Sequence, residues 1–214
     1  MRTRIALLAL LLVSACVGPP EGHRPRGKGD RLVLPADKET RQCVAELDKL
    51  RSRYTLLPEQ DFGNGCSIKG SVQLFAVDVP VTAIKAIRCP MARSLALWMR
   101  EDVQAAARRN LGARVTRLDT MGGYSCRRVN GAASGKLSQH ATGNAVDIGA
   151  FLLSDGRKVS VKAGWNSGDR EERDFLRDVR AAACKQFLTV LSPDYNAAHH
   201  DHLHFDMGGK AFCR

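Results

Sequence analysis

The sequence lacks several features that would assign it to a common class of protein. Its longest apolar run, Ile5 to Val13, has nine residues. As a helix that run would rise about 14 Å, whereas a membrane-spanning helix needs about 20 residues. The chain also contains no CxxC pair, no internal repeat and no nucleic-acid-binding motif. We therefore expect neither a polytopic membrane protein nor a cysteine-ligated zinc module.

The short apolar run is typical of an export signal. Arg2 and Arg4 precede it, and the string Val13-Ser14-Ala15-Cys16 ends it. That string resembles the lipobox of bacterial lipoproteins, in which the cysteine is acylated and becomes the mature N-terminus. We expect residues 1–15 to be a lipoprotein signal peptide and Cys16 to be the lipidation site. The alternative is an ordinary signal peptide with an unmodified Cys16.

Two regions follow the leader. Residues 16–41 contain four prolines and four glycines with almost no apolar periodicity, which predicts a flexible tether. Residues 42–214 have the size of one ordinary domain. We expect a monomer in the cell envelope, lipid-anchored on the periplasmic side of a bacterial membrane.

The balance of charge is basic. Lys and Arg total 33 against 22 Asp and Glu, which gives a formal charge of +11, or +9 without Arg2 and Arg4. In an exported protein the available polyanions are cell-wall polymers and anionic lipid headgroups rather than nucleic acid. We therefore predict an envelope partner and no nucleic-acid partner.

The cysteines indicate a disulfide framework. Assigning Cys16 to the anchor leaves six of the seven in an exported domain, an even number. Six cysteines allow fifteen connectivities, so the sequence alone does not determine the pairing. If sequence neighbours pair, the bridges are Cys43–Cys66, Cys89–Cys126 and Cys184–Cys213.

Apolar spacing and turn residues predict an α+β fold with an antiparallel sheet flanked by helices. Helices are expected at residues 37–54, 91–111 and 169–187, and Gly112 is expected to end the second one. Strands or extended segments are expected at residues 72–79, 81–87, 115–124, 145–153, 158–161 and 203–207.

Five of the six histidines lie in two short stretches, Ser138 to Ile148 and His199 to Asp206. Such clustering indicates a metal site. Asp147 is a charged residue inside an apolar strand, where a carboxylate must be hydrogen-bonded, paired or bound to a metal. Imidazole and carboxylate groups are good zinc ligands.

The second stretch alternates in a way that suits a strand. His202, His204 and Asp206 would share one face, which leaves Leu203 and Phe205 for the core. His199 and His200 are expected to be solvated loop residues or hydrogen-bond donors behind the metal ligands.

Together the two stretches form a recognisable motif. Ser-x-His-x-x-Gly-x-Ala-x-Asp followed by a late His-x-His resembles the metallopeptidase group of lysostaphin, the D-Ala-D-Ala carboxypeptidases and dipeptidases, and the hedgehog domain. The matching positions are Ser138, His140, Gly143, Ala145, Asp147, His202 and His204. From about Cys43 to Cys213 the longer context is similar to the bacterial extensin-like family. Its matching stretches are Tyr124 to Arg127, Ala183 to Phe187, and Pro193 to Asn196. The resemblance implies a hedgehog or D-Ala-D-Ala-peptidase-like fold held by disulfides.

The resemblance also implies roles for individual residues. His140, Asp147 and His204 would bind Zn²⁺, which polarises a scissile carbonyl and makes a water molecule more acidic. Two residues could act as general base. We place Asp201 first, because it lies three residues before His204 as in the carboxypeptidase branch. His202, two residues before His204, is the alternative and matches the lysostaphin branch.

An arginine in this group of peptidases stabilises the developing oxyanion. Arg127 matches it, although Ser125 and Cys126 separate it from Tyr124, so the alternatives are that Arg128 or neither arginine has this role. We expect a zinc-dependent peptidase acting on peptidoglycan peptide crosslinks or stems. The alternatives are a non-catalytic metal-binding or envelope-binding module, and a structural lipoprotein without metal.

Overall fold

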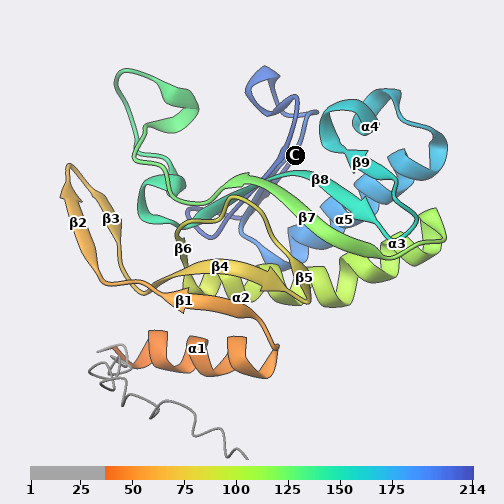
Figure 1. The fold of residues 1–214 in the computed structure, drawn as a ribbon. Coiled ribbons are helices and arrows are strands. Elements are labelled where there is room, and N and C mark those ends of the chain that lie inside the picture. The colour runs from red at the N-terminus through yellow and green to blue at the C-terminus, as the bar shows by residue number, and fades with distance from the viewer. Residues whose placement is uncertain (1–36) are drawn as a thin grey trace, which may run out of the picture. The chain divides into compact units, whose positions relative to one another are not determined.

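A computed structural model describes residues 37–214 of the chain (Figure 1). The predictions for the signal peptide, for Cys16 and for nearly all of the tether lie outside these residues. Within residues 37–214 no helix is long and apolar enough to cross a membrane.

The described chain begins with a helix, as the sequence predicts. In α1 (Lys38–Lys49) the side chain of Asp37 accepts a hydrogen bond from the backbone N–H of Thr40, which satisfies a free donor of the first turn. The helix is shorter than the predicted 37–54. Arg51 has a positive φ of 55°, so the chain turns there and enters strand β1 (Arg53–Leu56).

A small antiparallel sheet follows. Its central strand is β4 (Ser71–Val77), which pairs with β1. Strand β4 also pairs with β5 (Val79–Pro80) and β6 (Ile87–Arg88). A separate hairpin of β2 (Gln60–Gly63) and β3 (Cys66–Ile68) turns at the Gly63-Asn64-Gly65 sequence. Of the predicted extended segment 81–87, only its end becomes a strand.

The long helix predicted at 91–111 forms as one continuous rod from Cys89 to Leu111. It consists of α2 (Cys89–Leu97), a wider π-helical stretch η1 (Trp98–Val103) and α3 (Gln104–Leu111). Pro90 stands in its first turn, where the missing N–H costs nothing. Gly112 ends it with a left-handed φ of 63°, as predicted.

The second sheet is larger and holds most of the predicted strands. Its order is β12-β10-β11-β8-β7, with β9 paired to β8, and all pairs except β10–β12 are antiparallel. Its strands are β7 (Val115–Gly122), β8 (Ala145–Leu153), β9 (Lys158–Ser160), β10 (Thr189–Leu191), β11 (Leu203–Asp206) and β12 (Phe212–Cys213). A short helix α4 (Val161–Ser167), which the sequence pattern did not predict, follows β9.

The hydrophobic core lies between this sheet and the long helix together with α5 (Arg170–Gln186) (Figure 1). Trp98 is fully buried, and its ring packs against Phe151 of β8 and edge-on against Phe205 of β11. Its indole N–H donates to the carbonyl of Val179 in α5, so one side chain joins both helices to the sheet. The predicted α+β class with antiparallel sheets and helices is confirmed.

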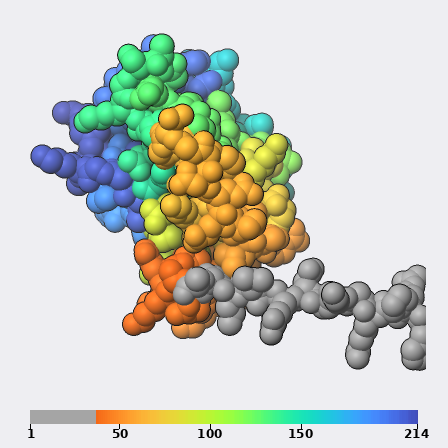
Figure 2. Space-filling model, turned by 90° about the vertical axis from the view of Figure 1, so that its left-hand side faces the viewer, coloured from red at the N-terminus to blue at the C-terminus, as the bar shows by residue number. Residues whose placement is uncertain are grey.

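Three disulfides form, but two of the predicted pairings are wrong. The bridges are Cys43–Cys89, Cys66–Cys126 and Cys184–Cys213, so only the last joins the expected partners. Neighbour pairing fails because α1 packs on α2, which brings Cys43 to Cys89 instead of Cys66. The β2–β3 hairpin in turn lies against the chain that follows β7, as the space-filling view shows (Figure 2).

Candidate metal centre

Two neighbouring strands and one tight turn bring the predicted ligands together. Strands β8 and β11 are antiparallel partners, and their register places His204 directly opposite Asp147. His140 lies just before β8 in the 3-10 turn η3 (Gln139–Thr142). Ser138 accepts a hydrogen bond from the backbone N–H of His140, and Gly143 ends the turn with a φ of 65°. The motif thus folds His140 back beside the strand that carries Asp147.

The three side chains meet at close range and are buried. His140 Nε2 lies 3.1 Å from Asp147 Oδ2, and His204 Nδ1 lies 2.9 Å from Asp147 Oδ1. The two ring nitrogens are 3.3 Å apart. His140, Asp147 and His204 are 2%, 7% and 8% exposed, and one ligand atom from each lies within 4.8 Å of the others. This group could hold a metal ion.

The outer ring nitrogens show that the group suits a cation. His140 Nδ1 donates to the carbonyl oxygen of Gly123, which can only accept, so this nitrogen carries the proton. His204 Nε2 lies 3.0 Å from Asp206 Oδ2 and donates to that carboxylate. In the neutral imidazoles the inner nitrogens then carry lone pairs. Two lone pairs and a carboxylate therefore point at one another, which is favourable only around a positive charge.

The pKa values of the group without a metal also indicate that it needs a positive charge at its centre. Burial disfavours the ionised carboxylate, but the polar interactions with His140 and His204 prevail and lower the pKa of Asp147 well below its usual range. Burial also disfavours the imidazolium of His204, yet its bonds to Asp147 and Asp206 raise its pKa to about 9. Without a metal, a proton on His204 supplies the positive charge.

The structure brings both candidate bases together as a pair. His202 Nδ1 lies 2.8 Å from Asp201 Oδ1, and His202 Nε2 lies 3.6 Å from Asp147 Oδ1. Asp201 thus holds the outer side of the ring, while the inner nitrogen faces the metal ligands. The hydrogen bond from His202 lowers the pKa of Asp201, so this carboxylate stays ionised. The arrangement matches a base and the group that orients it, with His202 on the inner side.

Arg127 reaches the centre and Arg128 does not. Arg127 Nη2 lies 3.8 Å from Asp147 Oδ2. The guanidinium of Arg128 instead donates to the carbonyl of Gly135 within its own loop. Of the two arginines that the sequence left open, Arg127 is therefore the one that lies beside the candidate ligand group.

His199 is buried beside the site and is not the solvated loop residue that was one of the two expectations. Its neighbour His200 is solvent-exposed, but His199 is only 7% exposed. His199 Nδ1 lies 2.8 Å from Asn196 Oδ1, which also accepts the backbone N–H of Ala198. Burial, with the charges of His202 and His204, lowers its pKa to about 4, so the ring is neutral. The signal for this contact was the Asn-x-x-His spacing.

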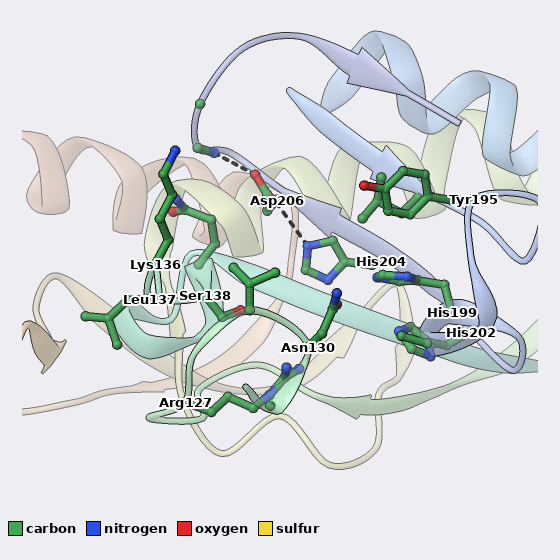
Figure 3. A pocket seen from close by; sticks show the side chains of 17 residues that line it. Arg127, Asn130, Lys136, Leu137, Ser138, Tyr195, His199, His202, His204 and Asp206 are labelled. Carbon is green, nitrogen blue, oxygen red and sulfur yellow. Dashed lines mark hydrogen bonds and ion pairs between the residues drawn. The ribbon is translucent and has the colours of Figure 1, made fainter. Parts of the chain in front are cut away.

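A pocket of about 590 Å³ opens at this site, and its lining includes Arg127, His199, His202 and His204 (Figure 3). One wall belongs to the loop after β7 and includes Arg127, Asn130 and Lys136. The opposite side carries Tyr195, His199 and His202, and His204 lies between the two walls. The site is therefore accessible to a ligand from outside although the three candidate metal ligands are buried.

Comparison with known proteins identifies one family. The sequence profile described as "Extensin-like protein C-terminus" matches residues 41–214. No curated protein and no solved structure matches the chain. The family expected from the sequence is confirmed, whereas the relation to the lysostaphin and hedgehog group stays a prediction.

Proposed function

This chain belongs to the extensin-like protein C-terminus family, and we propose that its domain is a zinc-dependent peptidase acting on peptidoglycan peptides. The observation that carries the proposal is the convergence of His140 Nε2, His204 Nδ1 and an Asp147 oxygen, with His202 Nε2 beside them. Two imidazoles and one carboxylate form the ligand set of many catalytic zinc sites, which leave a position open for substrate or water.

Zinc is the ion that best fits this donor set. Nitrogen ligands favour it over magnesium and calcium, which prefer oxygen. The outer ring nitrogen of each histidine is also hydrogen-bonded, that of His140 to the Gly123 carbonyl and that of His204 to Asp206. Such hydrogen bonds are usual for zinc-bound imidazoles. A zinc ion held there would act as a Lewis acid on a peptide carbonyl and make a water molecule more acidic.

The chain's own residues would do the remaining work. His202 accepts a proton at Nε2 from the attacking water, and the ionised carboxylate of Asp201 stabilises the imidazolium that results. His202 then returns the proton to the leaving amine. The Arg127 guanidinium, close to the Asp147 carboxylate, stabilises negative charge on the carbonyl oxygen. In this proposal His202 rather than Asp201 is the base.

The location completes the proposal. A lipid on Cys16, exposed when the leader of residues 1–15 is removed, would anchor the domain in the bacterial envelope on the periplasmic side, where peptidoglycan is the abundant peptide polymer. Three disulfides suit such an oxidising compartment. We further propose the hedgehog and D-Ala-D-Ala-peptidase type of fold, on the basis of the shared motif.

The test combines metal analysis with an activity assay. The purified chain should contain about one zinc per molecule, and His204→Ala should lose it. The zinc-loaded chain should release peptides from peptidoglycan, whereas His202→Ala should keep its zinc and release none. His200→Ala is the matched control, because His200 is exposed beside the site. Bound zinc without peptide release by the unaltered chain would instead support a non-catalytic metal-binding module.

A further inference from the structure

The wall of the pocket formed after β7 has an unusual composition. Between Asp119 and Asp147 the sequence contains no acidic residue, but it contains Arg127, Arg128 and Lys136. These three residues belong to one loop, residues 127–137, which we call the cationic loop. It contributes Arg127, Asn130 and Lys136 to the lining of the pocket (Figure 3).

The cationic loop is held in place rather than loosely attached. The backbone N–H of Val129 donates to the carbonyl of Lys136, and that of Ser138 donates to the carbonyl of Arg127. The preceding residue, Cys126, is bonded to Cys66 in the β2–β3 hairpin. Arg127 and Lys136 are therefore presented to the pocket from a closed hairpin, which lowers the entropy lost when a ligand binds.

Arg127 of this wall is paired with Asp147, whereas the charge of Lys136 is not compensated inside the pocket. Asp206 is the pocket's only lining carboxylate among the described residues, and it is already engaged by His204 and by the backbone N–H of Gly208. Within residues 37–214 no carboxylate lies within 4 Å of the Lys136 ammonium. A cation without a carboxylate partner in this part of the chain, beside a group that could itself hold a metal cation, attracts an anionic ligand.

We propose that the cationic loop binds a carboxylate of the substrate through Lys136, so that the pocket selects peptides with a free carboxylate near the scissile bond. The inference rests on the proposed peptidase function. Lys136 and Tyr195 lie on opposite sides of the pocket with His204 between them (Figure 3). A peptide whose carboxylate lies at Lys136 therefore passes over the metal ligands and extends towards Tyr195.

The experiment measures binding rather than turnover. Two peptides ending in D-Ala-D-Ala, one with a free C-terminal carboxylate and one amidated, are titrated against the zinc-loaded His202→Ala chain. The acid should bind about fivefold more tightly, the effect expected for one solvent-accessible charge pair. Lys136→Gln in the same background should abolish the difference, and Lys136→Glu should reverse it. Lys162→Gln, an exposed lysine on α4, is the matched control and should leave it unchanged.

The outcomes separate this inference from the proposed function. Equal binding of acid and amide, or a preference that survives both changes at Lys136, overturns the carboxylate site even if the unaltered chain cleaves peptidoglycan. A preference that depends on Lys136, in a chain that cleaves nothing, keeps the site and rejects the peptidase. Because Lys136 is exposed, its variants should fold normally, which circular dichroism would verify.

Discussion

Asp206 holds the far side of the His204 ring: its Oδ2 lies 3.0 Å from His204 Nε2, while its Oδ1 accepts the backbone N–H of Gly208. The two residues are two apart on β11 and share a face of the strand, as the alternation in the sequence predicts. One carboxylate thus fixes both the orientation and the tautomer of the imidazole that faces Asp147.

This contact predicts the effect of Asp206→Asn. An amide cannot supply the negative charge that makes His204 a good ligand, so zinc affinity should fall about 10- to 100-fold. Competition with a chelating dye would measure it. Asp201→Asn is the control, because Asp201 contacts His202 and none of the three ligands, and it should leave zinc affinity unchanged. Equal losses in both variants would contradict the assignment.

Stability of the metal-free chain should depend on pH through the same group. His204 has a pKa of about 9, above its unfolded value, so its stabilising effect is complete below about pH 6.5 and is lost as the pH rises to 9. Asp147 has a lowered pKa, so its contribution is complete above about pH 4 and is lost in stronger acid. Urea unfolding with a chelator present should show stability falling between pH 6.5 and 9, by a loss on the order of 3 kcal/mol.

The variant His204→Gln provides the control for that titration. It lacks the ionisable ring, so its stability should change much less between pH 6.5 and 9. In the unaltered chain the affinity for zinc should rise between pH 6.5 and 9, because the ion must displace the proton from His204 Nδ1. An affinity for zinc that does not rise between pH 6.5 and 9 would argue against His204 as a ligand.

Gly143 explains a fixed element of the motif in physical terms. Its φ is 65°, and a side chain there would approach the backbone nitrogen of Arg88 to 3.3 Å. Gly143→Ala should therefore destabilise the chain by about 1–2 kcal/mol and weaken zinc binding, because the turn that carries His140 ends at this residue. Gly156→Ala is the control, because Gly156 also has a positive φ but has open space around it. This variant should lower the stability of the chain without changing its zinc affinity.

Local signals were sufficient for the elements that frame the site. Strand β8 spans the predicted Ala145 to Leu153, because an apolar run there ends at an Asp-Gly turn. Helix α5 begins after Asp169, whose side chain accepts the backbone N–H of Glu172. Leu203 and Phe205 are buried in the core, so the alternation of β11 was also read correctly.

Features that depend on packing between distant segments could not be predicted from local sequence patterns. The pairing of Cys43 with Cys89 follows from α1 packing on α2, and nothing in the spacing of cysteines encodes that contact. The burial of His199 depends on a loop whose Asp194 is bonded to Trp165 and Arg177 on two other helices. The grouping of His140, Asp147 and His204 was predictable because their chemistry is unusual in an apolar context, whereas His199 sits among polar loop residues that look solvated.

The corrected disulfide pattern makes a prediction about the pocket. Replacing Cys66 and Cys126 by alanine should cost about 4 kcal/mol of stability in a chain-entropy estimate, because 60 residues separate them. It should also loosen the cationic loop, which starts at the next residue, and weaken binding of carboxylate peptides. Replacing Cys43 and Cys89 should cost similar stability, since 46 residues separate them, but leave peptide binding intact. Thermal unfolding and peptide titration would distinguish these effects.

The Asp201–His202 pair gives the sharpest test of the proposed chemistry. If His202 is the base, its Nδ1 must carry the proton, and the 2.8 Å bond to Asp201 is what keeps it there. In Asp201→Asn the amide no longer stabilises the imidazolium, so kcat should fall about 100-fold while KM changes little. In His202→Ala kcat should fall by at least the same factor. The double variant should have a kcat no lower than that of His202→Ala, because the two residues act as a unit. If Asp201 were itself the base, His202→Ala would retain substantial turnover, and the pH profile of kcat measured on the two single variants would show which group titrates.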